Sequence, residues 1–168
     1  ENKISLMEGL ASVYEKAKLY DGQFKWMYEA SKLKQKLNAT DYFYLSQAAI
    51  NAQQYLTADT IAQKYIENYP DQIQGYSFRV RALTAADADT TSGIAIPAYI
   101  QFNDFLKKDA TKNLSRILGN SGYLINYYAN VSREYEKAVA VCDEILALDP
   151  QNAAALQTKE LLVKRIKK

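Results

Sequence analysis

Few residues in this sequence could take part in catalysis. There is no histidine among the 168 residues, which removes the commonest general base and the commonest metal ligand. The single cysteine, Cys142, excludes an internal disulfide and a multi-cysteine metal site, and we expect it to be a buried apolar side chain. Neither a glycine-rich phosphate loop nor a Ser-His-Asp set is present. We therefore predict that the protein is not an enzyme and has no catalytic residues, cofactor or bound metal.

The segment Asp87-x-Asp89-x-Thr91 begins like a calcium-binding loop. Such a loop needs glycine at its sixth position and glutamate at its last, but Ser92 and Ala98 stand there. We interpret the segment as the end of a helix followed by a solvated loop.

Charge and hydropathy exclude two further classes of function. The net charge of +2 is too small to indicate nucleic-acid binding, and no run of about 18 apolar residues predicts a membrane span. Because the chain begins at Glu1 rather than Met, we expect it to be a piece of a longer protein. We interpret the basic tail as a helix that caps the fold, the alternative being contact with a membrane surface or an acidic partner; its cations are Lys159, Lys164, Arg165, Lys167 and Lys168.

Ala58, Ala98 and Ala138 stand at equal intervals, each within the same pattern of apolar residues, which we call a frame. Their spacings of three and four residues place each frame on one face of a helix. The small alanine lets a neighbouring helix approach closely, and the larger residues fill the space beside it. The three frames are Tyr55-x2-Ala58-x3-Ala62-x2-Tyr65, Ala95-x2-Ala98-x3-Phe102-x2-Phe105 and Tyr135-x2-Ala138-x3-Cys142-x2-Ile145.

Each of these helices is preceded by another predicted helix, and the two best copies both close at a proline. Pro70 and Pro150 differ by 80 positions, whereas two repeats of 34 residues would span about 68. We therefore place an insertion in the turn-rich segment 87–93 and in a helix that is lengthened over 111–129.

The pattern predicts an all-α protein with nine helices and no strand. Asp21-Gly22 is interpreted as the turn inside the first helix pair. We predict a single domain over 1–168, with about four antiparallel helix pairs and a C-terminal capping helix, at about 3–37, 41–68, 73–108, 112–148 and 152–167.

The frame resembles the tetratricopeptide repeat (TPR), whose second helix reads Tyr-x2-Ala-x3-Phe-x2-Ala before a closing proline. The stretch 119–152 matches best, through Ala138 and the ending Asp149-Pro150-x-Asn152. Ser46 and Asn126 depart from the pattern, because glycine is usual at both places. The resemblance implies a right-handed α-solenoid in which stacked helix pairs line a concave groove with their first helices.

The lengthened unit resembles TPR proteins that are frequent in Bacteroidetes. The matching residues are Arg81-Ala82-x4-Asp87 and Gly93-x-Ala95-x-Pro97-x-Tyr99. Many of those proteins carry secretory leaders, so the resemblance implies a bacterial protein that is periplasmic or secreted.

Matching to the family also implies which residues line the groove. Amides, tyrosines and an arginine in this set suit an extended peptide or a partner helix. Only Lys16 and Arg81 match the pattern that clamps two partner carboxylates, so we do not predict that clamp. The implied groove residues are Ser12, Lys16, Phe43, Gln47, Asn51, Ser77, Arg81, Tyr123, Tyr127 and Asn130.

Two functions follow from this reading. The first is a non-catalytic adaptor or scaffold that binds a peptide or helix of another protein, without nucleic acid; burial of Tyr123 and Tyr127 would argue against it. The alternative is a structural domain that packs against the rest of its own chain or self-associates through its ends. Exposed apolar residues on the first helix pair would favour that alternative, and the residues concerned are Leu6, Leu10, Val13 and Trp26.

Overall fold

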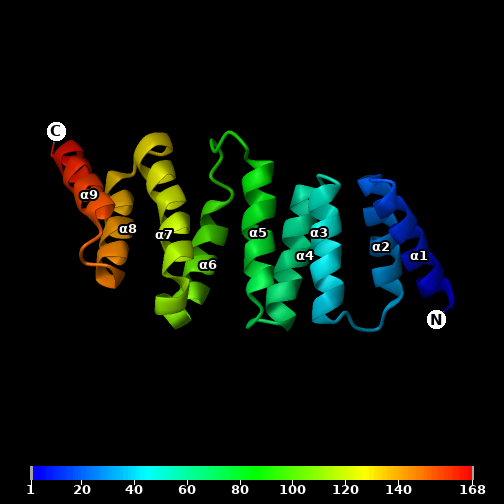
Figure 1. Cartoon of the computed structure of the whole chain (residues 1–168). Coiled ribbons are helices and arrows are strands. Elements are labelled where there is room, and N and C mark those ends of the chain that lie inside the picture. Colours follow the sequence, from blue (N-terminus) through cyan, green and yellow to red (C-terminus); the bar gives the residue numbers. More distant parts are fainter. Residues whose placement is uncertain (1, 168) are drawn as a thin grey trace. The chain divides into compact units, whose positions relative to one another are not determined.

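Nine α-helices account for most of residues 2–167, the part of the chain that the structure describes, and that part contains no β-strand. The computed structural model thus confirms the all-α prediction (Figure 1). The helices fall into two compact units, a first that ends at Ala86 and a second that begins at Asp87. The predicted pair 73–108 is divided between these units, so a single domain over 1–168 stays a prediction.

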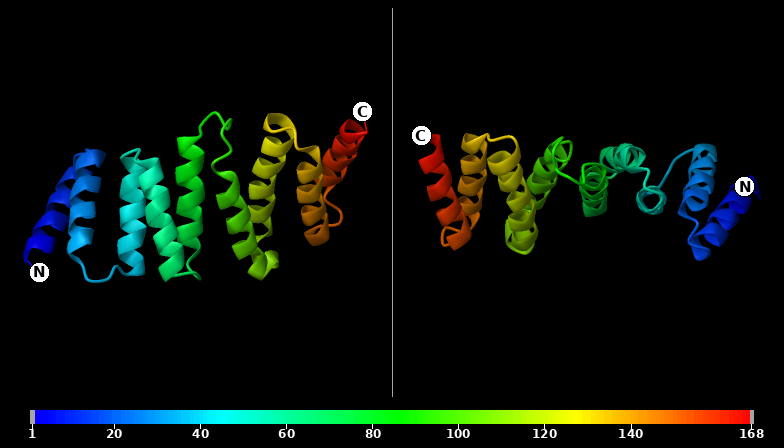
Figure 2. Two further views of the ribbon diagram at one scale, coloured as in Figure 1. Left: turned by 180° about the vertical axis from the view of Figure 1, so that it is seen from behind. Right: turned by 90° about the horizontal axis from the view of Figure 1, so that it is seen from above.

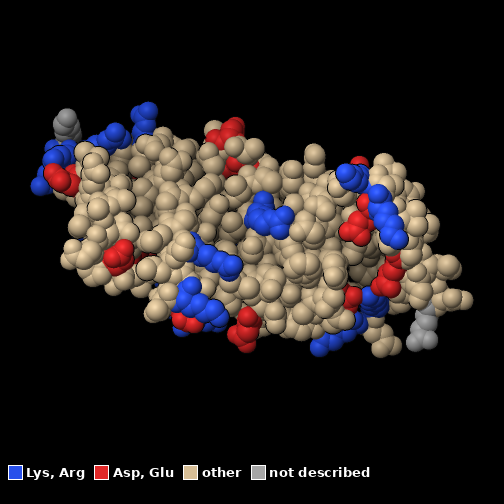
Figure 3. All heavy atoms as spheres, viewed as in Figure 1, with Lys and Arg blue, Asp and Glu red and all other residues tan. Residues whose placement is uncertain are grey.

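The first unit holds five helices, each packed against the next. Successive helices run in opposite directions, and two views show them side by side (Figures 1 and 2). Charged side chains lie on the outside of the unit (Figure 3). The helices are α1 (Asn2–Lys16), α2 (Tyr20–Leu33), α3 (Ala39–Asn51), α4 (Tyr55–Asn68) and α5 (Ile73–Ala86).

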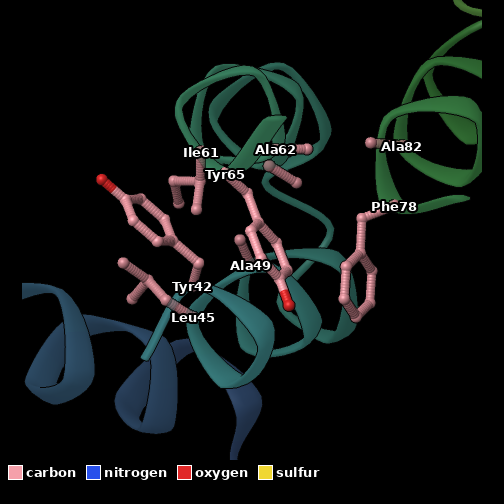
Figure 4. Packing of buried hydrophobic residues seen from close by; sticks show 9 residues of the cluster. Tyr42, Leu45, Ala49, Ile61, Ala62, Tyr65, Phe78 and Ala82 are labelled. Carbon is pink, nitrogen blue, oxygen red and sulfur yellow. The ribbon is translucent and has the colours of Figure 1, made fainter. Parts of the chain in front are cut away.

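Two alanines of the predicted frame, Ala58 and Ala62, and Ala49 of the preceding helix allow close packing in the core of the first unit. Ala49, Ala58 and Ala62 have no exposed surface, which lets α3 and α4 approach each other. Beside them Tyr42 stacks on Tyr65, with ring centroids 5.6 Å apart (Figure 4). Each large side chain buried in this way stabilises the fold by about 1.5–3 kcal/mol.

Helix α3 begins at Ala39 because the residue before it is a good cap. The Asn38 side chain accepts a hydrogen bond from the Asp41 backbone N–H, and the Asp41 carboxylate accepts one from the Asn38 N–H, both at 2.9 Å. Such a capping box satisfies two backbone donors that a helix start leaves free. It also fixes the Asp41 carboxylate at the start of α3.

The prediction of a turn at Asp21-Gly22 is wrong, because both residues lie inside α2. The chain turns at residues 17–19 instead, with Lys18 in a left-handed conformation at φ 57°. Asp21 occupies the first turn of α2, where a negative charge is favourable. Gly22 faces α1, and a Cβ there would collide with the Tyr14 ring. Close helix approach, rather than a turn, explains this glycine.

Non-glycine residues in the left-handed conformation recur between the first and second helices of the pairs. Lys18, Gln53 and Arg133 each have φ 57°, and each lies two positions before the first residue of the next helix. Gln53 and Arg133 are separated by the same 80 positions as Pro70 and Pro150. The backbone geometry therefore repeats where the sequence repeats.

The second unit holds four α-helices after a loop over residues 87–95. A 3-10 turn and a π-helical turn extend two of them at their ends. The predicted lengthened helix is observed as α7 together with the π-helical turn. The elements are α6 (Ile96–Leu106), a 3-10 turn η1 (Lys107–Asp109), α7 (Ala110–Asn126), a π-helical turn η2 (Tyr127–Val131), α8 (Tyr135–Leu148) and α9 (Ala153–Ile166).

The core of the second unit uses the other two alanine frames. Ala98 and Ala138 are buried, and Cys142 has no exposed surface. Burial raises the pKa of the Cys142 thiol, which keeps it protonated and unreactive. Helix α9 packs against α8 and contributes Leu162 to this core, as expected of a capping helix.

Candidate partner-binding surfaces

A row of polar side chains links α3 and α5 in the first unit. Gln47 donates a hydrogen bond to Asn51 at 2.8 Å, and Arg81 donates one to the Gln47 side-chain oxygen at 3.2 Å. The Arg81 guanidinium also lies over the Phe78 ring, 5.5 Å from its centroid. Arg81 is exposed, so most of its five donors remain open to solvent. The structure thus brings together three of the residues implied by the resemblance.

Two more of those residues lie on the same helices, and two lie on α1. Phe43 packs edge-on against Phe78 with centroids 5.2 Å apart, and Ser77 is half-buried on α5. Ser12 and Lys16 are both exposed on α1. Ser12, however, contributes to a separate feature, a pocket between α1, α2 and α3.

This α1–α3 pocket is a cavity of about 240 Å³ with an acidic rim. Its carboxylates belong to Glu8 and Glu15 of α1 and to Asp41 of α3, and its one cation is Lys34. On the face drawn in Figure 3, acidic and basic side chains lie side by side over α1–α3. Apolar walls come from Ala11, Met27, Leu37 and Tyr44.

Lys34 bridges two of the three carboxylates. Its ammonium group lies 2.6 Å from Asp41 and 2.8 Å from Glu8. Burial lowers the pKa of Lys34, but its hydrogen bonds to Asp41 and Glu8 outweigh burial, so the pKa is raised overall. Glu15 forms no ion pair with any residue that the structure describes. The pocket therefore keeps an excess of negative charge.

Gln23 of α2 is the most buried polar residue of the pocket lining. Only 6% of its surface is exposed, and its Oε1 atom has no hydrogen-bond partner among the described residues. A buried polar atom without a partner costs roughly 1–3 kcal/mol. The amide of Gln23 thus offers an unsatisfied acceptor beside the carboxylates.

In the second unit, the two groove tyrosines implied by the resemblance pack internally. Tyr123 stacks on Tyr99 with ring centroids 4.1 Å apart, and its hydroxyl is buried without a partner in the described chain. Burial, with smaller contributions from Tyr99 and Asp87, raises the pKa of Tyr123 to about 12. The Tyr127 ring covers Gly93, whose φ is +69° and where a Cβ would collide with that ring. Their assignment to a groove stays a prediction.

The aspartates of the calcium-like segment hold the loop together instead of facing a cavity. Asp87 is buried and accepts hydrogen bonds from the backbone N–H groups of Ser92 and Gly93, at 3.0 and 2.9 Å. These donors lower the pKa of Asp87. Asp89 accepts in the same way from Thr91 at 3.2 Å. Within the described residues, no cluster of three or more acidic or cysteine side chains could hold a metal.

A wider hollow of about 430 Å³ lies between α7, η2 and α9. Asn130 lines it and donates to Asn126 at 2.8 Å. Lys164 and Arg165 form its basic rim, and Leu161 on its wall is 56% exposed. Of the basic residues singled out in the tail, Lys164 and Arg165 line this α7–α9 hollow, and Lys168 lies outside the described residues.

Sequence reasoning missed the pocket residues other than Ser12. A signal was available on α1, because Glu8-x3-Ser12-x2-Glu15 is a polar stripe at helical spacing. No comparable signal marked Gln23 or Lys34. Gln23 lies on the second helix α2 and Lys34 directly follows that helix, a region that the matching to the family did not consider as groove-lining.

Comparison with known proteins rests on structure alone, since neither a family model nor a curated protein sequence matches this chain. The C-terminal part of a TPR repeat-containing protein from Cytophaga hutchinsonii superimposes with a TM-score of 0.69 and 25% identity over 94% of this chain. The fold is that of the tetratricopeptide repeat. MamA from Desulfovibrio magneticus shows the same TPR fold, with a TM-score of 0.55 and 15% identity over 99% of this chain.

The two TPR structures differ in how much of their length this chain spans. It covers 87% of the MamA structure and 60% of the Cytophaga structure. Ser46, where the repeat pattern usually has glycine, is a fully buried residue of α3. None of the helices described is both long and apolar enough to cross a membrane.

Proposed function

We propose that this TPR protein is a non-catalytic interaction module that binds an extended peptide or a helix of another protein along the first helices of its pairs. The observation that carries the proposal is the row Asn51–Gln47–Arg81, which joins α3 to α5 on an accessible surface. Amides can pair with a peptide backbone as both donors and acceptors, and Arg81 has free donors for a carboxylate or carbonyl.

Selection of peptides from a random display library on the wild-type protein tests this proposal. Selected peptides are expected to bind an Arg81→Glu variant about tenfold more weakly or worse, because a charge-assisted hydrogen bond becomes a repulsion. Lys64→Glu is the matched control, since Lys64 is exposed on the second helix α4 and the change of charge is the same. Fluorescence anisotropy measures both affinities.

Two results would contradict the proposal. One is a failure to select any peptide on the folded protein, and the other is equal weakening by both substitutions. Circular dichroism of each variant confirms that its helices are retained.

A second function, self-association or packing against the rest of its own chain, is favoured by the outer face of α1. Leu6, Leu10 and Val13 lie along one side of that helix and are 66%, 41% and 63% exposed. Trp26, by contrast, is half-buried on α2, with the Lys25 ammonium 5.6 Å from its ring centroid. The α1 leucines and valine therefore form the apolar surface that a partner could cover.

Sedimentation velocity over a range of concentrations tests self-association. A Leu6→Gln/Val13→Gln variant is expected to sediment as a monomer where the wild type forms larger species. Leu56→Gln is the control, because Leu56 on α4 is also 66% exposed. A wild type that stays monomeric throughout rules out self-association through this face.

A further inference from the structure

The α1–α3 pocket has a chemistry that selects among partners. We infer that it receives a cationic side chain, arginine or lysine, of a bound polypeptide. This inference rests on the proposed function and deepens it by naming one feature of the partner. Three properties of the pocket support it: its uncompensated charge, its unsatisfied acceptor and its size.

The charge of the pocket is negative even after its internal ion pairs form. Three carboxylates face one ammonium group, which leaves an excess of two negative charges. Glu8 and Asp41 share Lys34, at 2.8 and 2.6 Å, so each is only half neutralised. Glu15 has no cationic partner in the described chain. An incoming cation completes this arrangement, whereas an incoming carboxylate would be repelled by it.

The most buried polar residue of the pocket lining lacks a hydrogen-bond donor for its amide oxygen. Gln23 Oε1 is buried and has no hydrogen-bond partner among the residues described. Arginine and lysine heads carry five and three donors and no acceptor, so either head matches a lining of carboxylates and an amide oxygen. The Ser12 and Ser31 hydroxyls, also on the lining, add further acceptors.

The size and walls of the pocket suit one long side chain. Its volume of about 240 Å³ lies below the roughly 300–1,000 Å³ typical of sites for drug-sized ligands. Met27 and Leu37 provide apolar surface for the methylene stem of arginine or lysine. The Tyr44 ring, 56% exposed at the edge, can lie against the cationic head.

Titration of the whole protein with N-acetyl-arginine amide, followed by nuclear magnetic resonance, tests the inference directly. The capped amino acid has no free carboxylate, and the Met27 methyl group and the Gln23 side-chain amide report on the pocket. Saturable shifts of both signals are expected. N-acetyl-citrulline amide, which has nearly the same shape but no charge, is expected to leave them unchanged.

Two variants assign the binding to this pocket. Glu15→Gln removes the unpaired carboxylate without touching Lys34 and is expected to weaken binding about three- to fivefold, as for one solvent-accessible ion pair. Glu67→Gln, an exposed glutamate on α4, is the matched control and is expected to bind as the wild type does. Gln23→Leu keeps every charge, removes the acceptor and is also expected to bind more weakly.

Equal shifts with the citrulline compound, or unchanged arginine binding in both Glu15→Gln and Gln23→Leu, would overturn the inference. Selected display peptides that bind normally to these two variants would overturn it as well, while the proposed function would stand. Arginine binding in a protein on which no peptide can be selected would support the pocket and contradict the proposed function. The two failures are therefore distinguishable.

Discussion

The α1–α3 pocket and the α7–α9 hollow are both depressions lined by charged side chains, but they differ in whether those side chains already have partners within the protein. In the pocket, one carboxylate is unpaired and one buried acceptor is unsatisfied. In the hollow, Lys164 already pairs with Glu160 at 2.6 Å, and Arg165 lies 5.8 Å from the centre of the Tyr135 ring. The pocket thus keeps an unpaired carboxylate and a buried polar atom without a partner, whereas the two basic groups of the hollow already have contacts within the protein.

Substitutions in the two cores are expected to have the largest effects on stability. They test whether the pocket and the hollow differ because the core of one unit is packed less tightly than the core of the other. Leu45 and Ile145, 4% and 5% exposed, lie in the cores of the first and second units. Truncation of either to alanine is expected to lower the free energy of unfolding by about 2–5 kcal/mol, because each leaves a cavity. Urea unfolding followed by circular dichroism measures both, and Leu56→Ala is the exposed control.

Similar losses at the two sites would show that the units differ at their surfaces and not in the tightness of their cores. A loss below that of the exposed control at either site would contradict this view.

Removal of Lys34, the cation that bridges Glu8 and Asp41, is expected to increase the difference in charge between the pocket and the hollow. Lys34→Met leaves Glu8 and Asp41 facing each other without a positive charge, which is expected to lower the stability of the first unit by about 1–2 kcal/mol. The same variant should bind N-acetyl-arginine amide more tightly than the wild type, since the ligand replaces the lost cation. Urea unfolding and resonance titration measure the two effects.

Lys32→Met is the control for this change, because Lys32 forms an exposed ion pair with Glu29 outside the pocket. Weaker arginine binding in Lys34→Met would indicate that Lys34 orders the pocket and does not compete with a ligand for it.

The buried Tyr123 hydroxyl is expected to make the second unit sensitive to alkaline pH. Its folded-state pKa of about 12 exceeds the ordinary value of 10.0, so the protonated phenol favours folding. That contribution is complete below pH 10 and is lost as the pH rises toward 12. Tyr123→Phe is expected to reduce this loss and, by removing an unsatisfied polar group, to raise stability at neutral pH by about 1 kcal/mol.

Urea unfolding at neutral and alkaline pH measures both effects of this substitution. Tyr44→Phe is the control, since Tyr44 is 56% exposed. A Tyr123→Phe variant less stable than the wild type at neutral pH would show that the hydroxyl is satisfied in solution.

The smallest effects are expected at the left-handed turn residues, one in each unit. Gln53→Gly and Arg133→Gly are each expected to raise the free energy of unfolding by about 0.5–1 kcal/mol, because glycine adopts φ 57° without steric cost. Gln54→Gly is the control, since Gln54 has an ordinary φ of −83° and glycine there should lower stability. Stabilisation by the control alone would contradict the explanation.

The sequence predicted the fold better than it predicted the surface. Ala58 and Ala138 identified the helix pairs because small residues at helical spacing depend only on local geometry and close packing. Gly22 misled the turn assignment, since its role depends on the Tyr14 ring of another helix. The repeat pattern implied Gln47 and Arg81 as residues of one groove but predicted no contact between them. The missing partner of Gln23 depends on its whole surroundings and leaves no trace in spacing.

The only tryptophan and the only cysteine of the chain lie in different units. Trp26 is half-buried on α2, and Cys142 is enclosed in the core around α8. Indole fluorescence thus reports on the first unit alone, and the rate of thiol labelling reports on the second. The protein carries its own pair of optical and chemical probes, and a single denaturation experiment read with both would show whether the two units open together or one after the other.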